Sequence, residues 1–518
     1  MELKLINTYS VNKRPKPAKL MTEEEYKSRV QDLSATPNFL EADDAFLDKL
    51  QNLCDDLKDM ITYNTDTLTN GGTVYYVSNS GNDENDGLSP EKAWATLEKV
   101  NSFPFSEPST VLFERGSSWR GYLSVNRSNM FYSAYGEGLK PKIISAYDGI
   151  AHGEWVKTEY DNVWRLDTPF PEKDIPMIVY DDGVTYGDKK FLIKDLSENL
   201  DFMYNGELCS SEEVFDHKIY VYFDKGNPAE HFKSININML IKPADCSVQH
   251  LHDVTMHNLE FVYGRGVFFA TRSKNIRMSY CVSGWGGGHC YNKEHLRYGG
   301  GAGAWHSCDN MVFDNCYFYQ QFDSGVSPQY HWRDTDVSFF KDFITYNCLF
   351  ETTKWTLEYF TTQHTSNENR FENLYFGYNL CRLGGYGYGD RKELSAYVKS
   401  WGHENPCINS KFEYNIFDRA ANISIEVIGH APGLRGKHVS YEHIPAMNNN
   451  IYIEPKNKVF ANVNHIKYEF NEASHITMQK LGVETDAVYI FCNKKDDEVI
   501  SAEAVLNKTE EVTNEKDN

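Results

Sequence analysis

Apolar and polar positions alternate from residue 250 onward within a nine-residue frame that recurs along the chain. The frame reads Asn/Asp-x-x-Φ-x-Asn-Cys-x-Phe, where Φ is apolar and the named residues are preferences. It occurs at 253–261, 275–283, 310–318, 342–350, 373–381 and 409–417. Alternation with a period of two predicts β-strands, and the repetition predicts a stack in which each repeat forms one rung.

The seventh position of each frame sets the expected register of the stack. Those positions are Leu259, Cys281, Cys316, Cys348, Asn379 and Asn415, at spacings of 22, 35, 32, 31 and 36 residues. Spacings of this size suit one rung per repeat. Alternate apolar residues such as Met311 and Phe313 are expected to fill the interior. Asn and Cys side chains are expected to form ladders between rungs, so Asn315 and Asn347 are interpreted as structural.

A different periodicity marks the N-terminal region. Apolar residues recur there every three or four positions, which predicts an amphipathic helix. They are Phe46, Leu50, Leu53, Leu57, Met60 and Ile61. A capping-box pattern at 22–25 predicts an earlier helix that ends near Leu33. We expect this helical pair to cap the first rung, whose open edge would otherwise promote aggregation.

Two further stretches carry a family resemblance. Residues 74–97 read as a strand, a Gly/Asn/Asp-rich turn and a short helix, and 111–147 contain RGSSWRG and YGEGLKPKI. Together they resemble right-handed parallel β-helix carbohydrate-active proteins, notably glycoside hydrolase families 120 and 141. The resemblance extends over about 74 to 430. It implies an all-β solenoid with catalytic acids on neighbouring rungs, and xylosidase, xylanase and fucosidase activities occur among such proteins.

The expected fold is therefore all-β, a right-handed parallel β-helix with an N-terminal α-helical cap and a small all-β insertion. The strand-like runs of the insertion are separated by turns such as Asn205-Gly206. The expected organisation is a cap at 1–70, first rungs at 71–149, the insertion at 150–245, site-bearing rungs at 246–436, and C-terminal strands with a tail at 437–518.

Charge and composition narrow the possible partners. The net charge of −22 disfavours nucleic acid and anionic membrane surfaces. It also mildly disfavours a polyanionic substrate, although a local basic groove would override the global sign. The run of apolar residues that a membrane span needs is missing from the sequence. The N-terminus lacks a signal-peptide pattern, so we expect a cytoplasmic protein, or a secreted one if a leader has been removed.

Metal and cofactor signals are weak. The 11 cysteines form no CxxC pair and no Cys/His metal spacing, so we interpret them as reduced, buried side chains. The acidic loop around Asp83 lacks the full spacing of a calcium loop. We expect neither a cofactor nor a metal.

Several polar residues follow the register positions by similar distances and are expected to share one outer face. They are His289, Asp323, Glu358, Asp390 and Glu426, at offsets of 8, 7, 10, 11 and 11 residues. Neighbouring rungs lie about 4.8 Å apart, so the carboxyl groups of Asp323 and Glu358 are expected about 5–6 Å apart. That spacing suits a retaining glycosidase, with Asp323 as nucleophile and Glu358 as acid/base, or the reverse order. An inverting pair would lie two rungs apart, for example Asp323 with Asp390.

Aromatic rings and planar donors near these acids are the candidate substrate contacts, because sugars stack on flat rings and bind fixed hydrogen-bond donors. The candidates are Trp285, His289, Trp305, Tyr330, His331, Trp332, Arg333, Asp390, Arg391, Trp401, His403 and Glu404.

The favoured function is a retaining glycoside hydrolase that acts on a neutral plant or host glycan, with an oligosaccharide or polysaccharide as its partner. Two alternatives stay open. A polysaccharide lyase or uronate epimerase would need a Lys, Arg or Tyr base and a cation for the uronate, and lysines look sparse near the acidic pair. The second alternative is a non-catalytic glycan-binding β-helix.

Overall fold

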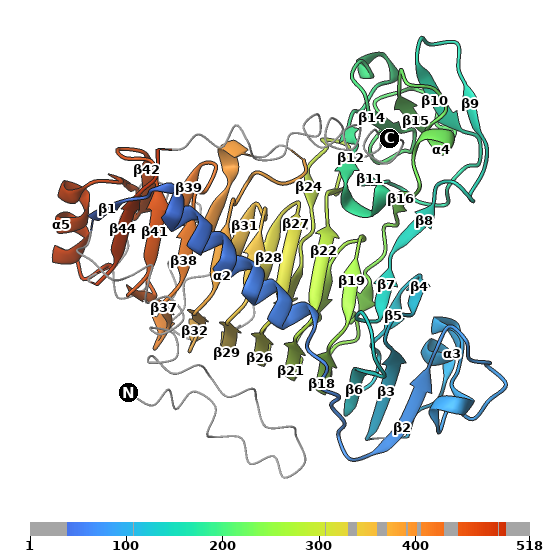
Figure 1. Cartoon of the computed structure of the whole chain (residues 1–518), viewed down its shortest axis with the longest axis horizontal. Helices are drawn as coiled ribbons and strands as arrows, with labels where there is room; N and C mark the ends of the chain where they lie inside the picture. The colour runs from blue at the N-terminus through green and yellow to red at the C-terminus, as the bar shows by residue number, and fades with distance from the viewer. Residues whose placement is uncertain are drawn as a thin grey trace.

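The computed structural model describes residues 39–106, 108–305, 307–329, 339–359, 370–389, 392–400, 406–428, 444–484 and 486–493. Within these residues the chain is mostly β, and most strands belong to three long sheets that are predominantly parallel (Figure 1). Successive stretches of chain add one strand to each sheet in turn, as the runs β26–β27–β28 and β29–β30–β31 show. Each such run forms one rung.

The twelve-stranded sheet holds the first strand of each rung. Its strands are β2 (Thr73–Val77), β3 (Ser109–Glu114), β6 (Met130–Tyr135), β18 (His252–His257), β21 (Lys274–Ser279), β26 (Asp309–Asp314), β29 (Phe339–Tyr346), β33 (Tyr375–Gly377), β37 (Lys411–Glu413) and β40 (Ala446–Asn448), with β32 (Arg370–Glu372) and β36 (Cys407–Ile408) beside them.

The eleven-stranded sheet holds the second strand of each rung. In spatial order its strands are β1 (Phe39–Glu41), β44 (Val488–Phe491), β41 (Ile451–Glu454), β38 (Ile416–Asp418), β34 (Leu380–Arg382), β30 (Leu349–Glu351), β27 (Tyr317–Gln321), β22 (Val282–Gly286), β19 (Glu260–Val262), β7 (Lys142–Ile144) and β4 (Ser118–Arg120).

The eight-stranded sheet holds the third strand of each rung and carries the acids of interest. Its strands are β20 (Val267–Phe269), β25 (Ala302–Trp305), β28 (Ser324–Gln329), β31 (Trp355–Tyr359), β35 (Ala396–Ser400), β39 (Ile423–Val427), β42 (Val459–Val463) and β43 (Ile466–Glu469). All neighbours pair in parallel except β42 and β43.

The repeat frame sets the register as the sequence predicted. The residues that directly follow the register positions pair in order, for example Tyr317 with Leu349 and Leu349 with Leu380. The apolar positions Met311, Phe313 and Phe376 are buried in one continuous core between the sheets. The frame therefore identified both the rungs and their interior residues.

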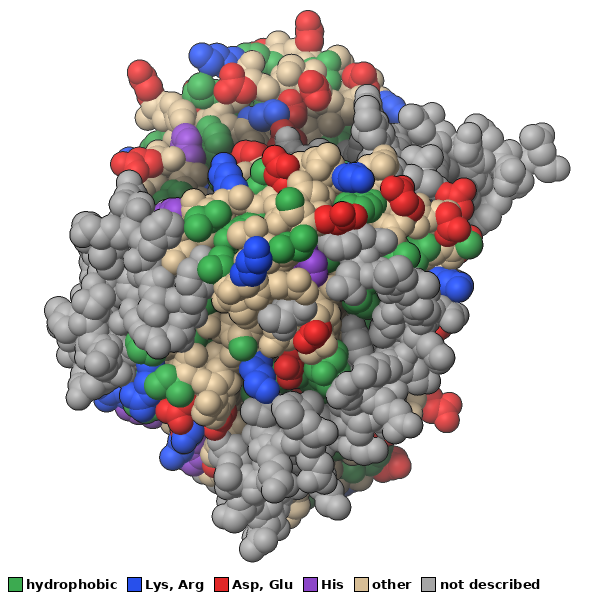
Figure 2. Space-filling model, turned by 90° about the vertical axis from the view of Figure 1, so that its left-hand side faces the viewer, with side chains coloured by type: hydrophobic (Ala, Val, Ile, Leu, Met, Phe, Trp, Pro, Cys, Tyr) green, Lys and Arg blue, Asp and Glu red, His purple; other side chains and the backbone are tan. Residues whose placement is uncertain are grey.

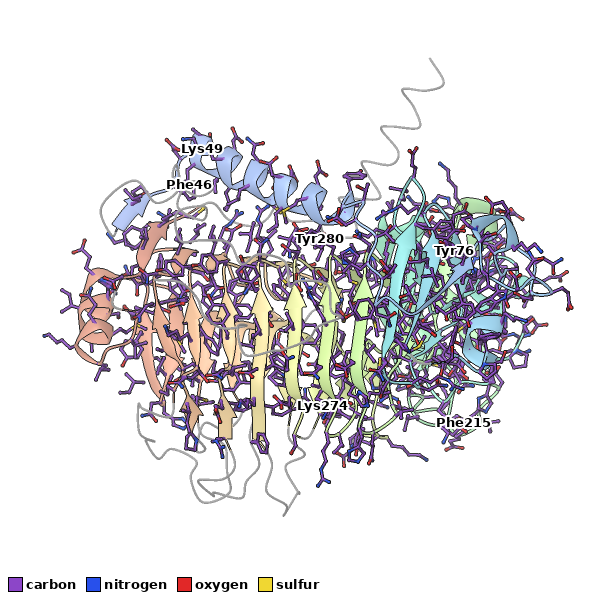
Figure 3. All side chains as sticks on the ribbon, turned by 90° about the horizontal axis from the view of Figure 1, so that it is seen from below. Phe46, Lys49, Tyr76, Phe215, Lys274 and Tyr280 are labelled. Carbon is purple, nitrogen blue, oxygen red and sulfur yellow. The ribbon has the colours of Figure 1, made fainter. Side chains whose placement is uncertain are left out.

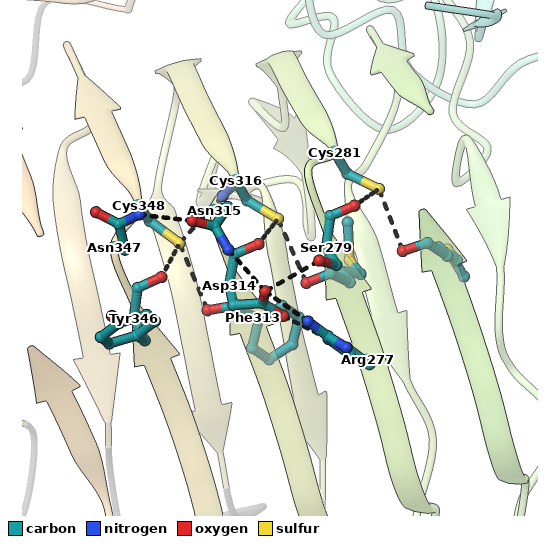
Figure 4. Close-up of polar contacts among 12 residues, drawn as sticks. Arg277, Ser279, Cys281, Phe313, Asp314, Asn315, Cys316, Tyr346, Asn347 and Cys348 are labelled. Atoms are coloured by element: carbon teal, nitrogen blue, oxygen red, sulfur yellow. Dashed lines mark hydrogen bonds and ion pairs between the residues drawn. The ribbon is translucent and has the colours of Figure 1, made fainter. Parts of the chain in front are cut away.

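Two of the Asn residues that recur in the frame lie where the backbone bends. Asn315 and Asn347 have φ of 52° and 50°, in the left-handed region that Asn tolerates better than most residues. Asn347 Nδ2 also donates to Asn315 Oδ1 at 2.5 Å, which links two rungs. Figure 4 shows this ladder beside the thiols of Cys281, Cys316 and Cys348, which donate to backbone carbonyls. All eleven cysteines are free and buried.

Replacing Asn347 tests these two contributions separately. Asn347→Ala removes the ladder hydrogen bond and places a Cβ-bearing residue without a polar side chain at positive φ, so we expect a loss of about 2–3 kcal/mol in unfolding free energy. Asn347→Gly loses the same hydrogen bond but no longer strains the backbone, so it should be more stable than Asn347→Ala by about 1 kcal/mol. Urea denaturation measures both, and equal stability of the two variants would contradict this account.

The N-terminal helix does not cap the first rung. Helix α2 (Asp44–Thr62) begins after the N-cap Asp43 and lies along the side of the stacked sheets (Figures 1 and 3). Its buried face packs on residues of several rungs, including Leu349, Leu380 and Ile416. The expectation of an end cap was wrong for this helix because its apolar stripe runs its whole length and matches a row of rungs. The earlier helix predicted at 22–33 lies outside the described residues.

The first rung is covered by a different segment. Trp94, Leu97, Val100 and Phe105 are buried in the main core, and Leu97 and Val100 belong to the short helix α3 (Leu97–Ser102). This segment follows β2 and lies with it at one end of the stack (Figure 1).

The insertion has its own core. Two further sheets, largely antiparallel, contain β8 (Ala146–Asp148), β9 (Trp155–Lys157), β10 (Val163–Leu166), β11 (Ile178–Tyr180), β12 (Thr185–Tyr186), β13 (Asp188–Lys189), β14 (Asp201–Tyr204), β15 (Ile219–Tyr222) and β16 (Ile235–Asn238). Their buried residues form a separate cluster that includes Trp155, Phe202 and Ile237. The chain returns to the stack through β17 (Ala244–Asp245), which pairs with β5 (Leu123–Ser124).

An asparagine ladder ends at the opposite end of the stack. Asn379, Asn415 and Asn450 are linked side chain to side chain, and Asn450 Nδ2 donates to Glu484 Oε1 at 2.9 Å. Glu484 follows α5 (Glu472–Lys480), and Tyr452 also donates to its Oε1 at 2.6 Å. Figure 2 shows this end of the molecule, where acidic and basic side chains alternate over the described surface.

Glu484 makes stability depend on pH. Complete burial raises the pKa of Glu484 from 4.5 to about 7. A carboxyl with a raised folded-state pKa stabilises the fold fully below pH 4.5, and this contribution is lost as pH rises through about 7. Relative to Glu484→Gln, the wild-type protein should therefore lose about 3 kcal/mol of unfolding free energy between pH 4.5 and pH 8. Denaturant titrations at both pH values check this, and parallel pH profiles of the two proteins would contradict it.

Candidate functional site

One polar position repeats along the outer face of the eight-stranded sheet. Strand pairing aligns Glu358 with Lys399, Lys399 with Glu426, and Glu426 with Asn462. Ser327 precedes Glu358 in the same row, because Val326 pairs with Leu357. We call Ser327, Glu358, Lys399, Glu426 and Asn462 the polar column.

Alternation along the strand orients Glu358. Its neighbours Leu357 and Tyr359 are buried in the main core, so the Glu358 side chain lies on the other side of the sheet. It is nevertheless only 4% exposed. Two donors from the preceding strand reach its Oε2: Gln329 Nε2 at 3.0 Å and Ser327 Oγ at 3.3 Å. Donors of this kind favour the ionised form of a carboxylate.

The next residue of the column is a buried ammonium group. Lys399 Nζ forms an ion pair with Glu426 Oε2, and Asn462 Nδ2 donates to Glu426 Oε1 at 3.4 Å. Burial lowers the pKa of Lys399 from 10.5, while the charges of Glu426 and Glu358 oppose that change. Lys399 thus lies between two carboxylates that are two strands, or roughly 9.6 Å of backbone, apart.

Asp323 does not face Glu358. It directly precedes β28, and the register places it beside Lys354, whose Nζ is 3.1 Å from Asp323 Oδ1. Four residues separate Asp323 from Ser327, the residue beside Glu358, so the two acids are roughly 13 Å apart along the strands. The expected 5–6 Å separation was therefore wrong. Asp323 and Glu358 follow their register positions by 7 and 10 residues. They could pair across neighbouring strands only if the corner before Glu358 were three residues longer than the corner before Asp323, and it is not.

Asp323 and Lys354 instead form a buried ion pair at a corner of the stack. The side chains are 8% and 4% exposed. Lys354 Nζ also lies 3.3 Å from the centroid of the Trp355 ring. We therefore interpret the Asp323–Lys354 pair as stabilising the fold.

Two other predicted contacts lie away from the polar column. His289 belongs to the short strand β23 (His289–Cys290), which pairs with β24 (Arg297–Tyr298). It is 5% exposed, and burial together with the charge of Arg265 lowers the pKa of His289 to about 3. Trp285 is buried against Tyr186 and Tyr388, where the insertion meets the stack. Both side chains pack this junction, so the expectation that His289 shares the face of Glu358 was wrong.

Trp305 remains as an exposed aromatic residue on the face that carries the column. Its neighbour Ala304 is in the core, and Trp305 itself is 37% exposed. It pairs with Gln329, the residue that donates to Glu358. The other predicted contacts lie outside the described residues: Tyr330, His331, Trp332, Arg333, Asp390, Arg391, Trp401, His403 and Glu404.

Sequence reasoning missed the two lysines. Lys354 contacts Asp323 and Lys399 contacts Glu426, so the expectation that lysines are sparse near these acids was wrong. A signal was present: the third strands read WTLEY, AYVKS and ISIEV, in which the fourth letter is Glu358, Lys399 and Glu426. Aligning these strands directly, rather than counting from the previous corner, places all three in one row.

The described residues contain no group of three or more His, Cys, Asp or Glu side chains that could hold a metal ion. In the same part of the chain, no helix is long and apolar enough to cross a membrane.

Comparisons with known proteins find one short sequence similarity and several distant structural ones. A lacto-N-biosidase of Bifidobacterium longum subsp. longum is 33% identical over 109 residues, which are 19% of this chain and 7% of that protein. The GH136 lacto-N-biosidase from Eubacterium ramulus has a TM-score of 0.42 and 12% identity, covering 91% of this chain and 81% of that one. A further glycoside hydrolase structure has a TM-score of 0.42 and 9% identity, covering 81% and 96%. No protein-family model matches.

Proposed function

We propose that the chain is a right-handed parallel β-helix that hydrolyses glycosidic bonds on the outer face of its eight-stranded sheet. The observation that carries this proposal is the polar column, in which two carboxylates flank a buried ammonium group. The short sequence similarity to a lacto-N-biosidase supports the same class of reaction. The repeated parallel strand pairing of the three sheets supports the fold class.

Glu358 is the proposed base. Gln329 and Ser327 donate to its carboxylate and favour the charged form, which can take a proton from an attacking water. The Lys399–Glu426 pair is the proposed donor to the leaving oxygen, because its ammonium group carries a proton and burial lowers the pKa of Lys399. Water then adds to the anomeric carbon as the glycosidic bond breaks.

The spacing of the two carboxylates favours inversion. Inverting glycosidases leave about 6.5–9.5 Å between their carboxyl groups, whereas retaining enzymes need about 5–5.5 Å. The separation of two strands, roughly 9.6 Å, is near the wider value. We therefore propose an inverting reaction in place of the retaining one expected from the sequence. The sugars at the bond itself are proposed to be neutral, since two carboxylates would repel a uronate there.

A second candidate is a polysaccharide lyase. The specific observation in its favour is Lys399, a lysine of lowered pKa in the polar column. Such an amine is a suitable base for removing the proton next to a uronate carboxylate. Its ion pair with Glu426 argues against this role, because the pair holds the amine in its protonated form.

Product analysis separates the candidates. The full-length protein would be incubated with a panel of aryl glycosides and oligosaccharides, and products followed by NMR from the first minutes. An inverting hydrolase first releases the anomer opposite to that of the substrate. Release of the same anomer would overturn the proposed stereochemistry, and an unsaturated uronide detected by ultraviolet absorbance would identify a lyase.

A further inference from the structure

Arg265 is a partly buried cation that has no anionic side chain beside it among the described residues. It precedes β20, and its guanidinium makes neither a hydrogen bond nor an ion pair within the described residues. Burial alone lowers its pKa from 12.5. Burying a charged group without a partner is costly, so an anionic ligand would stabilise a guanidinium in this position.

A second cation lies next to it. The backbone N–H of Arg265 donates to the carbonyl of Ile241 at 2.9 Å, which brings the adjacent Lys242 to the same corner. Lys242 Nζ donates to Ser247 Oγ at 2.9 Å and is 3.9 Å from Asp245 Oδ1. Burial lowers the pKa of Lys242, and the positive charge of Arg265 contributes in the same direction. Two cations this close repel one another, which an anion between them would relieve.

The exposed ring of Trp305 completes the group. Lys242 Nζ lies 5.7 Å from the centre of the Trp305 ring, and Phe268 packs against the same ring at 5.6 Å. Trp305 is on β25, two strands from the Glu358 strand, which is roughly 9.6 Å along the stack. A glycan lying along the polar column would thus reach this ring from Glu358.

We propose that Arg265, Lys242 and Trp305 form a subsite for a carboxylated sugar, an inference that rests on the proposed glycan-hydrolysing function. The Trp305 ring stacks on the apolar face of the sugar, and the two cations bind its carboxylate. The net charge of −22 would repel an acidic ligand, and the two cations of the subsite provide a local positive charge that attracts it. Uronic and sialic acids share this chemistry, so the substrate class is an acidic oligosaccharide cleaved at a neutral bond.

Binding measurements on matched ligands test the subsite. Calorimetry would compare sialyllactose with lactose, and trigalacturonic acid with its carboxyl-reduced form, on full-length protein carrying Glu358→Gln to prevent turnover. The acidic member of at least one pair should bind more tightly, and the pair that does so identifies the acidic sugar. Arg265→Gln should weaken that binding about 10- to 100-fold, Arg265→Lys less, and Trp305→Ala should weaken both members. Lys467→Gln, an exposed lysine at the far edge of the same sheet, is the matched control.

The outcomes distinguish this inference from the function on which it rests. Equal binding of acidic and neutral members, or unchanged binding by Arg265→Gln, overturns the subsite. If neutral substrates are still hydrolysed in a Glu358-dependent way, the proposed function stands without it. Binding that depends on Arg265 in a protein that hydrolyses none of the panel would instead retain the subsite and refute the hydrolase.

Discussion

Replacing Glu358 by glutamine is expected to lower the turnover number about 10²–10⁴-fold, the usual contribution of a general base. The amide keeps the size of the side chain but cannot accept a proton from water. Gln329 and Ser327 can still donate to its remaining carbonyl oxygen, so the fold should be retained. Substrate affinity should change little, because the loss falls on the chemical step.

Kinetics on the best substrate of the panel measure this effect, with circular dichroism to confirm the fold. Glu426→Gln should show a comparable loss, since it breaks the pair with Lys399. Glu372→Gln, on β32 of the twelve-stranded sheet, is the matched control and should retain wild-type turnover. If Glu358→Gln has the turnover number of the wild type, the polar column does not take part in the reaction.

Replacing Asp323 by asparagine is expected to destabilise the protein by about 3–5 kcal/mol, because it removes the carboxylate charge of a buried ion pair with Lys354. The double variant Asp323→Asn with Lys354→Met removes both charges and should recover most of that loss. Denaturant unfolding of the four proteins in this double-mutant cycle measures the coupling.

A surface pair provides the control for this cycle. Lys142 and Glu260 are 3.0 Å apart with side chains 39% and 17% exposed, and breaking that pair should cost only about 0–1 kcal/mol. At temperatures where Asp323→Asn is folded, it should keep its hydrolytic activity. A folded but inactive Asp323→Asn would return this residue to the nucleophile role that the sequence pattern suggested.

Counting residues along the sequence placed the first two strands of each rung correctly but misplaced the acids of the third strand. The register positions of the first two strands were correct because the frame spans a single turn of nearly constant length, whose sixth residue, Asn or Tyr, has positive φ in every frame. The third strand was placed by counting through a second corner whose length varies between rungs. Ser324 is eight residues after Cys316, whereas its partner Trp355 is seven after Cys348. This shift of one residue adds to the difference of three between the offsets of Asp323 and Glu358, so four residues separate Asp323 from Ser327, the residue beside Glu358.

The helix α2 shows a related limit. Its apolar stripe was evident from the sequence, and Leu50, Leu53 and Leu57 are buried as expected. An apolar stripe indicates that one face of the helix is buried, but it does not indicate which surface of the protein buries it. The side of the stack offered a matching apolar row across several rungs, whereas the first rung was already covered by Trp94 and Leu97.

By itself the sequence determined the parallel rungs, their core and their structural Asn and Cys ladders, because these depend on local periodicity and on residues that tolerate the bends. Only the tertiary structure decided which charges meet. Ion pairs such as Lys399–Glu426 join residues 27 positions apart, and their contact depends on the exact register of strands that corners of unequal length connect. The same holds for Arg265, whose lack of an anionic neighbour within the described chain appears only once every strand is in place.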